Sequence, residues 1–165
     1  MMRIPPCDKP DPADVKVPTI ADSVPATWIM SQEVICASED LDVEALMDLM
    51  IRRRIGCVPV VDANGHPIGM ITKFDLVEQV LAAKNSDASD SPLVAGKLMM
   101  PLALTLDEHA TIAHTAAVMA IEDVHHVPIV ADSGCLIGVV STMDIVRWLA
   151  ANDGFVRQDT SAKDS

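Results

Sequence analysis

Hydrophobic and polar positions along this 165-residue chain follow one pattern that occurs twice. Residues 58–76 and 127–145 align without a gap at a spacing of 69 residues, and seven of their nineteen pairs are identical. Each copy has an apolar-Pro-apolar run, then a glycine, then an aspartate near its end. An internal repeat is a stronger guide to architecture than any single motif. We therefore interpret the chain as two copies of one unit.

The periodicity within each copy predicts its elements. One buried helical face is indicated by the i, i+3, i+4, i+7 spacing of Val43, Leu46, Met47 and Met50, and the second copy repeats this face. We expect a short strand at 34–37 before this helix, with Ser38 as the helix N-cap. Hairpins and a second helix follow, with strands at 57–61, 67–72, 127–130 and 136–141 and helices at about 73–83 and 142–151.

The fold class that this order predicts is α/β, with two β-α-β-β-α units that pack on one another. Residues 1–22 are rich in proline and scattered charges, so we expect a flexible N-terminal tail. The expected organisation is unit 1 at 25–83, a linker at 84–97, unit 2 at 98–151 and a polar C-terminal tail at 152–165.

Composition narrows the range of partners. The chain has 24 acidic and 12 basic residues, and the net charge of −12 disfavours binding to nucleic acid or to an anionic membrane. Half of the residues are hydrophobic, but no apolar run reaches the length of a membrane span. The four cysteines form no CxxC pair, which favours a reduced, cytoplasmic setting, and we expect Cys57 and Cys135 to be buried, inert thiols.

Several signatures occur in both copies and in the same order. Before the first strand stand Trp28-Ile29-Met30-Ser31 in one copy and Lys97-Leu98-Met99-Met100 in the other, and each copy continues with the apolar-Pro-apolar strand, the hairpin glycine and Gly-x-x-Thr/Ser-x-x-Asp. This order resembles the tandem cystathionine β-synthase (CBS) domain pair, or Bateman module, over about residues 25–151. The resemblance implies two units about a pseudo-twofold axis and a regulatory module rather than an enzyme. It also implies two clefts for adenosine-containing ligands such as AMP, ADP, ATP or S-adenosylmethionine.

The resemblance also implies roles for the aspartates of the repeated motif. Asp75 with Thr72, and Asp144 with Ser141, would contact a ribose, because a carboxylate can accept hydrogen bonds from both ribose hydroxyls. The following helix N-terminus favours negative charge. A hydroxyl residue followed three positions later by an acid is also a helix capping box, which needs no ligand. Both interpretations stay open.

By the same resemblance, the adenine ring would lie against the segments that lead into the first strand of each unit. These positions are Met30, Ser31 and Val34 in the first copy and Met100 and Ala103 in the second. Ordinary core packing is the alternative for all five residues.

The two copies differ just before the proline-containing strand. By the resemblance, His125 and His126 would contact phosphate in the cleft that holds Thr72 and Asp75, whereas a structural histidine pair is the alternative. The other cleft would combine Ser141 and Asp144 with Gly56 and Cys57, with Arg54 as its nearest cation, so we expect it to bind more weakly or to stay empty. A solvated helix cap is the alternative for Arg54. Phe74 and Met143 stand where family members have arginine, which weakens the case for a triphosphate.

No catalytic constellation, cofactor motif or metal-ligand pattern stands out, so an enzyme is not expected. His66, His109 and His114 are interpreted as surface residues. A high apolar fraction with only 2% aromatic residues favours a homodimer formed through helix faces, and the effector protein is unknown. Two alternatives to a nucleotide sensor remain, namely a binder of S-adenosylmethionine or a related thioether, and a ligand-free dimerisation scaffold.

Overall fold

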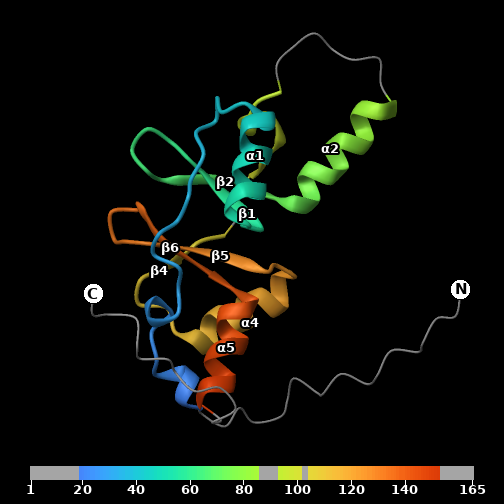
Figure 1. Cartoon of the computed structure of the whole chain (residues 1–165). Coiled ribbons are helices and arrows are strands. Elements are labelled where there is room, and N and C mark those ends of the chain that lie inside the picture. The colour runs from blue at the N-terminus through green and yellow to red at the C-terminus, as the bar shows by residue number, and fades with distance from the viewer. Residues whose placement is uncertain (1–18, 86–92, 102–103, 153–165) are drawn as a thin grey trace, which may run out of the picture.

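The computed structural model describes residues 19–85, 93–101 and 104–152 (Figure 1). Most of the two expected tails, residues 86–92 of the expected linker, and Ala103 lie outside these residues. The elements in chain order are the 3-10 helices η1 (Ile20–Asp22) and η2 (Ala26–Trp28), α1 (Val43–Arg53), β1 (Cys57–Val61), β2 (Pro67–Thr72), α2 (Lys73–Asn85), α3 (Ala95–Leu98), β3 (Met100–Pro101), β4 (Leu106–Asp107), α4 (Ile112–Glu122), β5 (His126–Val130), β6 (Leu136–Ser141) and α5 (Thr142–Asn152).

The predicted α/β class and the repeated unit are confirmed. Strands β1 and β2 pair antiparallel with Cys57 opposite Thr72, and β5 and β6 pair in the same way with His126 opposite Ser141. A parallel partner precedes each hairpin: β4 pairs with β5, and in the first half the expected strand at 34–37 is a single bridge from Ala37 to Val60. The strands lie between the helices of the two halves (Figure 1).

The helix α1 begins later than the sequence indicated. Its N-cap is Asp42, whose carboxylate accepts hydrogen bonds from the backbone N–H groups of Glu44 and Ala45 at 2.9 and 3.1 Å. The expected cap, Ser38, instead hydrogen-bonds to Asp40 and so helps to lower the pKa of that exposed carboxyl group. The assignment of Ser38 as N-cap is therefore wrong, because the carboxylate of Asp42, one residue before the buried face begins at Val43, satisfies the helix N-terminus directly.

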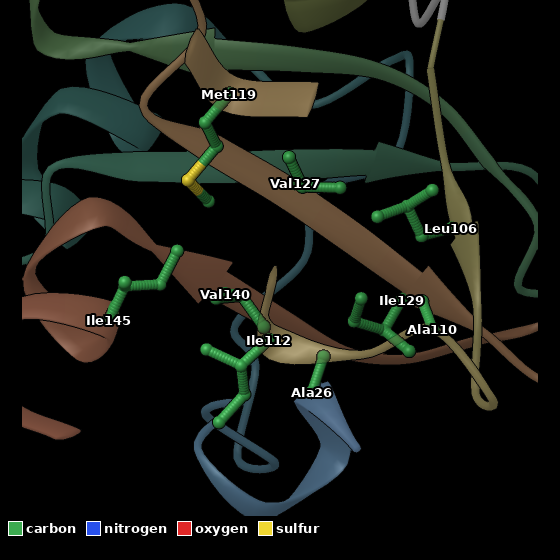
Figure 2. Close-up of a cluster of buried hydrophobic side chains, with 9 residues drawn as sticks. All are labelled: Ala26, Leu106, Ala110, Ile112, Met119, Val127, Ile129, Val140 and Ile145. Atoms are coloured by element: carbon green, nitrogen blue, oxygen red, sulfur yellow. The ribbon is translucent and has the colours of Figure 1, made fainter. Parts of the chain in front are cut away.

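Two hydrophobic cores form, one on each side of the strands. The predicted helical face is buried in the first core through Val43, Leu46 and Met50, and its repeat is buried in the second core. Figure 2 shows the second core, in which Ala26 of η2 packs near Ile112 of α4. The first residues of the expected unit 1 therefore belong to the core of the second half.

The two halves exchange their N-terminal segments. The N–H of Ala26 donates to the carbonyl of Ala110 at 2.8 Å, and Ser31 forms a bridge with Val139 of β6. In return, the N–H of Ala95 donates to the carbonyl of Leu41 at 2.8 Å, and β3 pairs with β2. In space, neither half is therefore a continuous segment such as 25–83 or 98–151.

Two stretches that were expected to be a tail or a linker are ordered parts of these cores. The end of the expected N-terminal tail forms η1, which contacts α4. The end of the expected linker forms α3, in which Ala95 is fully buried in the first core.

The hairpins of the two halves touch at their turns. The N–H of Leu136 donates to the carbonyl of Gly65 at 3.0 Å, and the Cys135 thiol lies 3.5 Å from the carbonyl oxygen of Asn64. Gly65 and Gly134 both have a φ of +84°, which the equivalent hairpin turns require and glycine adopts without strain. These contacts join two halves that are otherwise built alike.

The segment exchange predicts an effect on stability at Ala26. Ala26 is fully buried in the second core, so Ala26→Leu is expected to lower the free energy of unfolding by about 1–3 kcal/mol through overpacking. Ala45→Leu, on the exposed face of α1, is the matched control and should change it by less than about 0.5 kcal/mol. Urea unfolding measures both. Equal stability of the two variants would contradict the placement of Ala26 in the core.

Candidate functional site

The turn from β2 into α2 holds Asp75 in a fixed orientation. One oxygen of its carboxylate, Oδ2, accepts hydrogen bonds from the Thr72 backbone N–H at 2.6 Å and from the Thr72 hydroxyl at 2.7 Å. The capping box that the sequence predicted is therefore present. Among the described residues, Oδ1 of Asp75 has no hydrogen-bond partner. Because a carboxylate offers about four acceptor positions, the cap leaves some of them available.

The turn from β6 into α5 repeats this arrangement with one addition. The Asp144 Oδ2 accepts hydrogen bonds from the backbone N–H of Ser141 at 2.8 Å and from its hydroxyl at 2.5 Å. The other oxygen, Oδ1, lies 3.4 Å from Nη1 of Arg147, one helical turn further along α5. Asp144 is mostly buried, whereas Arg147 is largely exposed.

A cleft between the halves, here called cleft A, has a volume of about 490 Å³. It brings together five of the sequence-predicted site residues, namely Thr72, Asp75, Met100, His125 and His126. The exchanged strand β3 supplies Met100, so both halves and one crossing segment contribute to the wall. The grouping of the first motif with the histidines, expected from the resemblance, is thus present in the structure.

The rest of the cleft A wall is largely apolar. Its remaining lining residues are Gly56, Met70, Lys73, Phe74, Pro101, Leu104, Asp123 and Val124. Phe74 is 67% exposed and places a ring where the resemblance implies a cation. Lys73 and Asp123 add one charge of each sign, and neither residue was singled out from the sequence.

A second cleft, here called cleft B, is smaller, at about 260 Å³. It brings together the predicted residues Ser31, Val34, Cys57, Ser141 and Asp144. His126 also lines it, as do Glu33 and Arg147. A larger share of the surface is polar in cleft B than in cleft A, and His126 lies in the wall between the two.

The two histidines differ in their environment. His125 is exposed, whereas His126 is half-buried at the start of β5. Burial lowers the pKa of His126, the charge of His125 lowers it further, and the carboxylate of Asp144 acts in the opposite direction. At neutral pH and without a bound anion, the His126 ring is therefore uncharged.

The Cys57 thiol, half-buried in cleft B, is unreactive at neutral pH. Burial, and then the negative charge of Asp144, raise its pKa to about 11. Since the thiolate is the nucleophilic and metal-binding form, the environment of Cys57 matches the inert thiol expected from the sequence.

Two predicted site residues lie elsewhere. Arg54 is exposed at the left-handed C-cap of α1, with a φ of 55°, and is not among the described residues that line cleft A or cleft B. Met30 packs against the second core and against Gly138, and it too is absent from the described linings of both clefts. For Met30 the core-packing alternative therefore describes the structure, and Ala103 lies outside the described residues.

The cation of cleft B is Arg147, which sequence reasoning missed. The sequence feature that could have identified it is its position three residues after Asp144, because side chains three apart on a helix are neighbours. The aligned position in the first copy is Glu78, so the comparison of the two copies gave no repeated cation to notice.

One group of side chains has the composition of a metal site. Ligand atoms of Glu108, His109 and Asp132 lie within 4.8 Å of one another, and His109 Nε2 is 3.9 Å from Asp132 Oδ1. His109 and Asp132 are largely exposed, as expected for surface residues.

Within the described residues, no helix has the length and apolar character needed to cross a membrane.

Comparison with curated proteins identifies partial relatives. An uncharacterized protein of Methanocaldococcus jannaschii is 32% identical over 134 residues, which are 75% of this chain and 31% of the relative. An uncharacterized protein of Methanopyrus kandleri is 30% identical over 126 residues, or 76% of this chain and 62% of the relative. The chain thus spans less than two thirds of either relative. Subunit gamma-3 of the Bos taurus 5′-AMP-activated protein kinase is 29% identical over 108 residues, 62% of this chain and 21% of that subunit.

Solved structures share the fold. The CBS domain pair of protein MJ0100, in complex with 5′-methylthioadenosine and S-adenosyl-L-methionine, matches with a TM-score of 0.66 and 25% identity, over 76% of this chain and 99% of that one. CBSX2 in complex with AMP matches with a TM-score of 0.65 and 20% identity, over 76% of this chain and 96% of that one. The family model for the CBS domain matches residues 23–82 and again residues 95–151. The chain therefore belongs to the CBS domain family, as a tandem pair of CBS domains.

Proposed function

We propose that this protein is a regulatory module that binds an adenosine-containing ligand, with an adenine nucleotide as the first candidate. The observation that carries this proposal is the grouping of Asp75, His125, His126 and Met100 around cleft A. Its volume of about 490 Å³ falls in the range of small-molecule sites, which is about 300–1,000 Å³.

Each part of the ligand has a matching group in cleft A. The free Oδ1 of Asp75 can accept hydrogen bonds from ribose hydroxyls while Oδ2 continues to cap α2. Met70 and Met100 supply polarisable apolar surface for a purine ring. Lys73, His125 and a protonated His126 are the cations within reach of a phosphate in this cleft.

The relatives support a ligand of this class. The MJ0100 domain pair, which was solved with 5′-methylthioadenosine and S-adenosyl-L-methionine, is 25% identical and covers most of this chain. A relative of similar identity is a subunit of a kinase named for activation by 5′-AMP. The adenosine part is common to these molecules, so the ribose contact is the part of the proposal that they favour most.

A second candidate ligand is S-adenosylmethionine or a related thioether. Two features of cleft A favour it, namely the exposed ring of Phe74 in place of a cation and the carboxylate of Asp123 beside the histidines. An apolar wall suits a thioether, and a carboxylate attracts the positive sulfonium of S-adenosylmethionine but repels a phosphate. The affinities of the same protein for AMP and for 5′-methylthioadenosine distinguish a nucleotide ligand from a thioether ligand.

A ligand-free scaffold is the remaining alternative, because both capping boxes are formed without a ligand. We propose that the protein also forms a homodimer in the cytoplasm and acts on an effector protein. Apolar side chains exposed on α2 and α5 support the dimer, namely Phe74, Val77, Leu81, Met143, Val146 and Leu149.

Removal of the Asp75 carboxylate tests the ribose contact. Asp75→Ala should weaken adenosine binding by about 10- to 100-fold, since hydrogen bonds to a charged group contribute about 1.5–3 kcal/mol. It also removes a helix cap, which costs about 1 kcal/mol of stability. Asp144→Ala removes the equivalent cap in the other half and serves as the control for that cost. Calorimetry that shows unchanged adenosine affinity in folded Asp75→Ala would exclude the contact.

The histidine pair predicts a difference in pH dependence between AMP and adenosine. A bound phosphate favours protonated imidazole, so the histidines should raise AMP affinity at about pH 6 and lose this contribution by about pH 8. The low pKa of ligand-free His126 places its contribution toward the acidic side. The phosphate of AMP itself gains charge near about pH 6, which acts in the opposite direction. The other charged side chains that line cleft A are those of Lys73, Asp75 and Asp123.

The measurement is the ratio of AMP to adenosine affinity at the two pH values, in the parent protein and in His125→Gln/His126→Gln. The ratio should fall with rising pH in the parent relative to the double variant. If the two proteins give the same change in ratio, the histidines are structural and take no part in phosphate binding.

A further inference from the structure

We propose that Glu108, His109 and Asp132 bind a divalent transition-metal ion such as Zn²⁺. Ligand atoms of the three side chains lie within 4.8 Å of one another. The group belongs to the second half and is not among the described residues that line cleft A or cleft B. The inference is independent of the proposed function, because it uses no residue assigned to ribose, purine or phosphate.

The three side chains come from two turns at one edge of the second sheet. Glu108 and His109 follow β4, and Asp132 lies in the turn between β5 and β6. Because β4 and β5 are parallel, their carboxyl ends meet at the same edge. Asp132 is 24 residues from Glu108 in the sequence, so no local spacing pointed to a metal-ligand pattern.

Backbone contacts position this group and leave ligand atoms available. The N–H of Asp132 donates to Oε1 of Glu108 at 3.4 Å, which joins the two turns. The N–H of His109 donates to Oδ1 of Asp107 at 2.8 Å, which fixes the turn after β4. Since a carboxylate offers about four acceptor positions, a single hydrogen bond leaves Glu108 able to bind an ion.

An ordinary ion pair explains the geometry less well. Nε2 of His109 lies 3.9 Å from Oδ1 of Asp132, which is beyond hydrogen-bond distance, and the two side chains are 77% and 85% exposed. An exposed pair of this kind contributes little to stability. A zinc ion would bond to both atoms at about 2.0–2.2 Å, and side chains so exposed can rotate to close that distance.

The first half shows that the fold does not need this group. It has the same parallel pairing before its hairpin, as a bridge from Ala37 to Val60. The residues at the corresponding positions, 69 earlier in the sequence, are Glu39, Asp40 and Ala63. These positions offer neither an imidazole nor a ligand from the hairpin turn. The group of Glu108, His109 and Asp132 is therefore specific to the second half.

The donor atoms select the class of ion. An imidazole nitrogen suits Zn²⁺, Cu²⁺, Ni²⁺ or Fe²⁺, whereas Mg²⁺ and Ca²⁺ prefer sites built from oxygen alone. In a tetrahedral zinc site, three protein ligands leave one position for water. The net charge of −12 also favours cations near the chain.

An ion at this place would act next to contacts between the two halves. The carbonyl of Ala110, which follows His109, accepts the N–H of Ala26. The N–H of Leu136, in the same hairpin as Asp132, donates to the carbonyl of Gly65. A metal ion fastens the two turns that make these contacts, so its binding should stabilise the folded chain.

The experiment measures Zn²⁺ binding to the full chain, purified without a polyhistidine tag and with its cysteines reduced. Calorimetry should show a Zn²⁺ site in the parent that His109→Ala and Asp132→Ala each weaken by about tenfold or more, because loss of even an outer-shell partner costs about 10- to 100-fold. Zn²⁺ should raise the melting temperature of the parent more than that of either variant.

Two controls address folding and the identity of the ligands. His114→Ala removes an exposed histidine of α4 outside the group and should bind Zn²⁺ as the parent does. Asp132→Ala introduces the side chain that the first half already has at Ala63, so the variant should fold. Co²⁺ in place of Zn²⁺ shows whether a cysteine is a ligand, because a bound thiolate adds an intense charge-transfer band.

The outcomes are distinct from those of the proposed function. The inference fails if the parent binds no Zn²⁺, if both variants bind it as tightly as the parent, or if the Co²⁺ spectrum shows thiolate ligation. Displacement of Zn²⁺ by an equal concentration of Mg²⁺ would overturn the assignment to a transition metal. Adenosine affinity should be the same in His109→Ala and in the parent, so neither result bears on cleft A.

Discussion

The structure depends on a buried backbone contact between segments that are far apart in the sequence. The N–H of Ala26 donates to the carbonyl of Ala110, and the N–H of Ala95 donates to that of Leu41 in the other half. Both alanines are fully buried, so a larger side chain at either crossing would overpack the core. Each half therefore completes its core with a segment that precedes the other half.

This exchange also builds the clefts. After Ala26 the chain passes along cleft B at Ser31 and Val34, and after Ala95 it passes along cleft A at Met100 and Leu104. A ligand in either cleft would thus contact a hairpin-and-helix turn, the facing half and a crossing segment together. Such a ligand stabilises the arrangement in which all three are in place. A change in that arrangement is the most direct route from ligand binding to regulation.

The capping role of the Asp75 and Asp144 carboxylates is compatible with the proposed ribose contact. In each, Oδ2 is held by the backbone and hydroxyl of the residue three positions earlier. This fixes the direction of the second oxygen before any ligand arrives, which lowers the entropic cost of binding. The two clefts then differ at the second carboxylate oxygen, because Arg147 approaches Oδ1 of Asp144.

Much of the unit could be predicted because the repeat and the periodicity depend on local spacing. The hairpins, the helical faces and the grouping of Asp75 with the histidines all follow from that spacing and from the family resemblance. The exchange of segments could not be predicted, since Ala26 and Ala95 occupy equivalent positions and nothing local tells which core each one enters.

The errors at single residues have similar causes. Ser38 and Asp42 are both good cap residues, and only the packed length of α1 decides between them. Arg54 is nearer in sequence to Cys57 than Arg147 is. It lies in the left-handed cap of α1, however, and is not among the described residues that line cleft B. Met30 follows the crossing at Ala26 and is held by close contact with Gly138.

The central claim is that a ribose binds at Asp75 in cleft A, and a crystal structure of the protein with AMP tests it most directly. The account predicts electron density for the ribose within hydrogen-bond distance of Asp75 Oδ1, with the purine against Met100 and the phosphate toward His125. Density for AMP only outside cleft A, or an empty cleft A at saturating AMP, would contradict it.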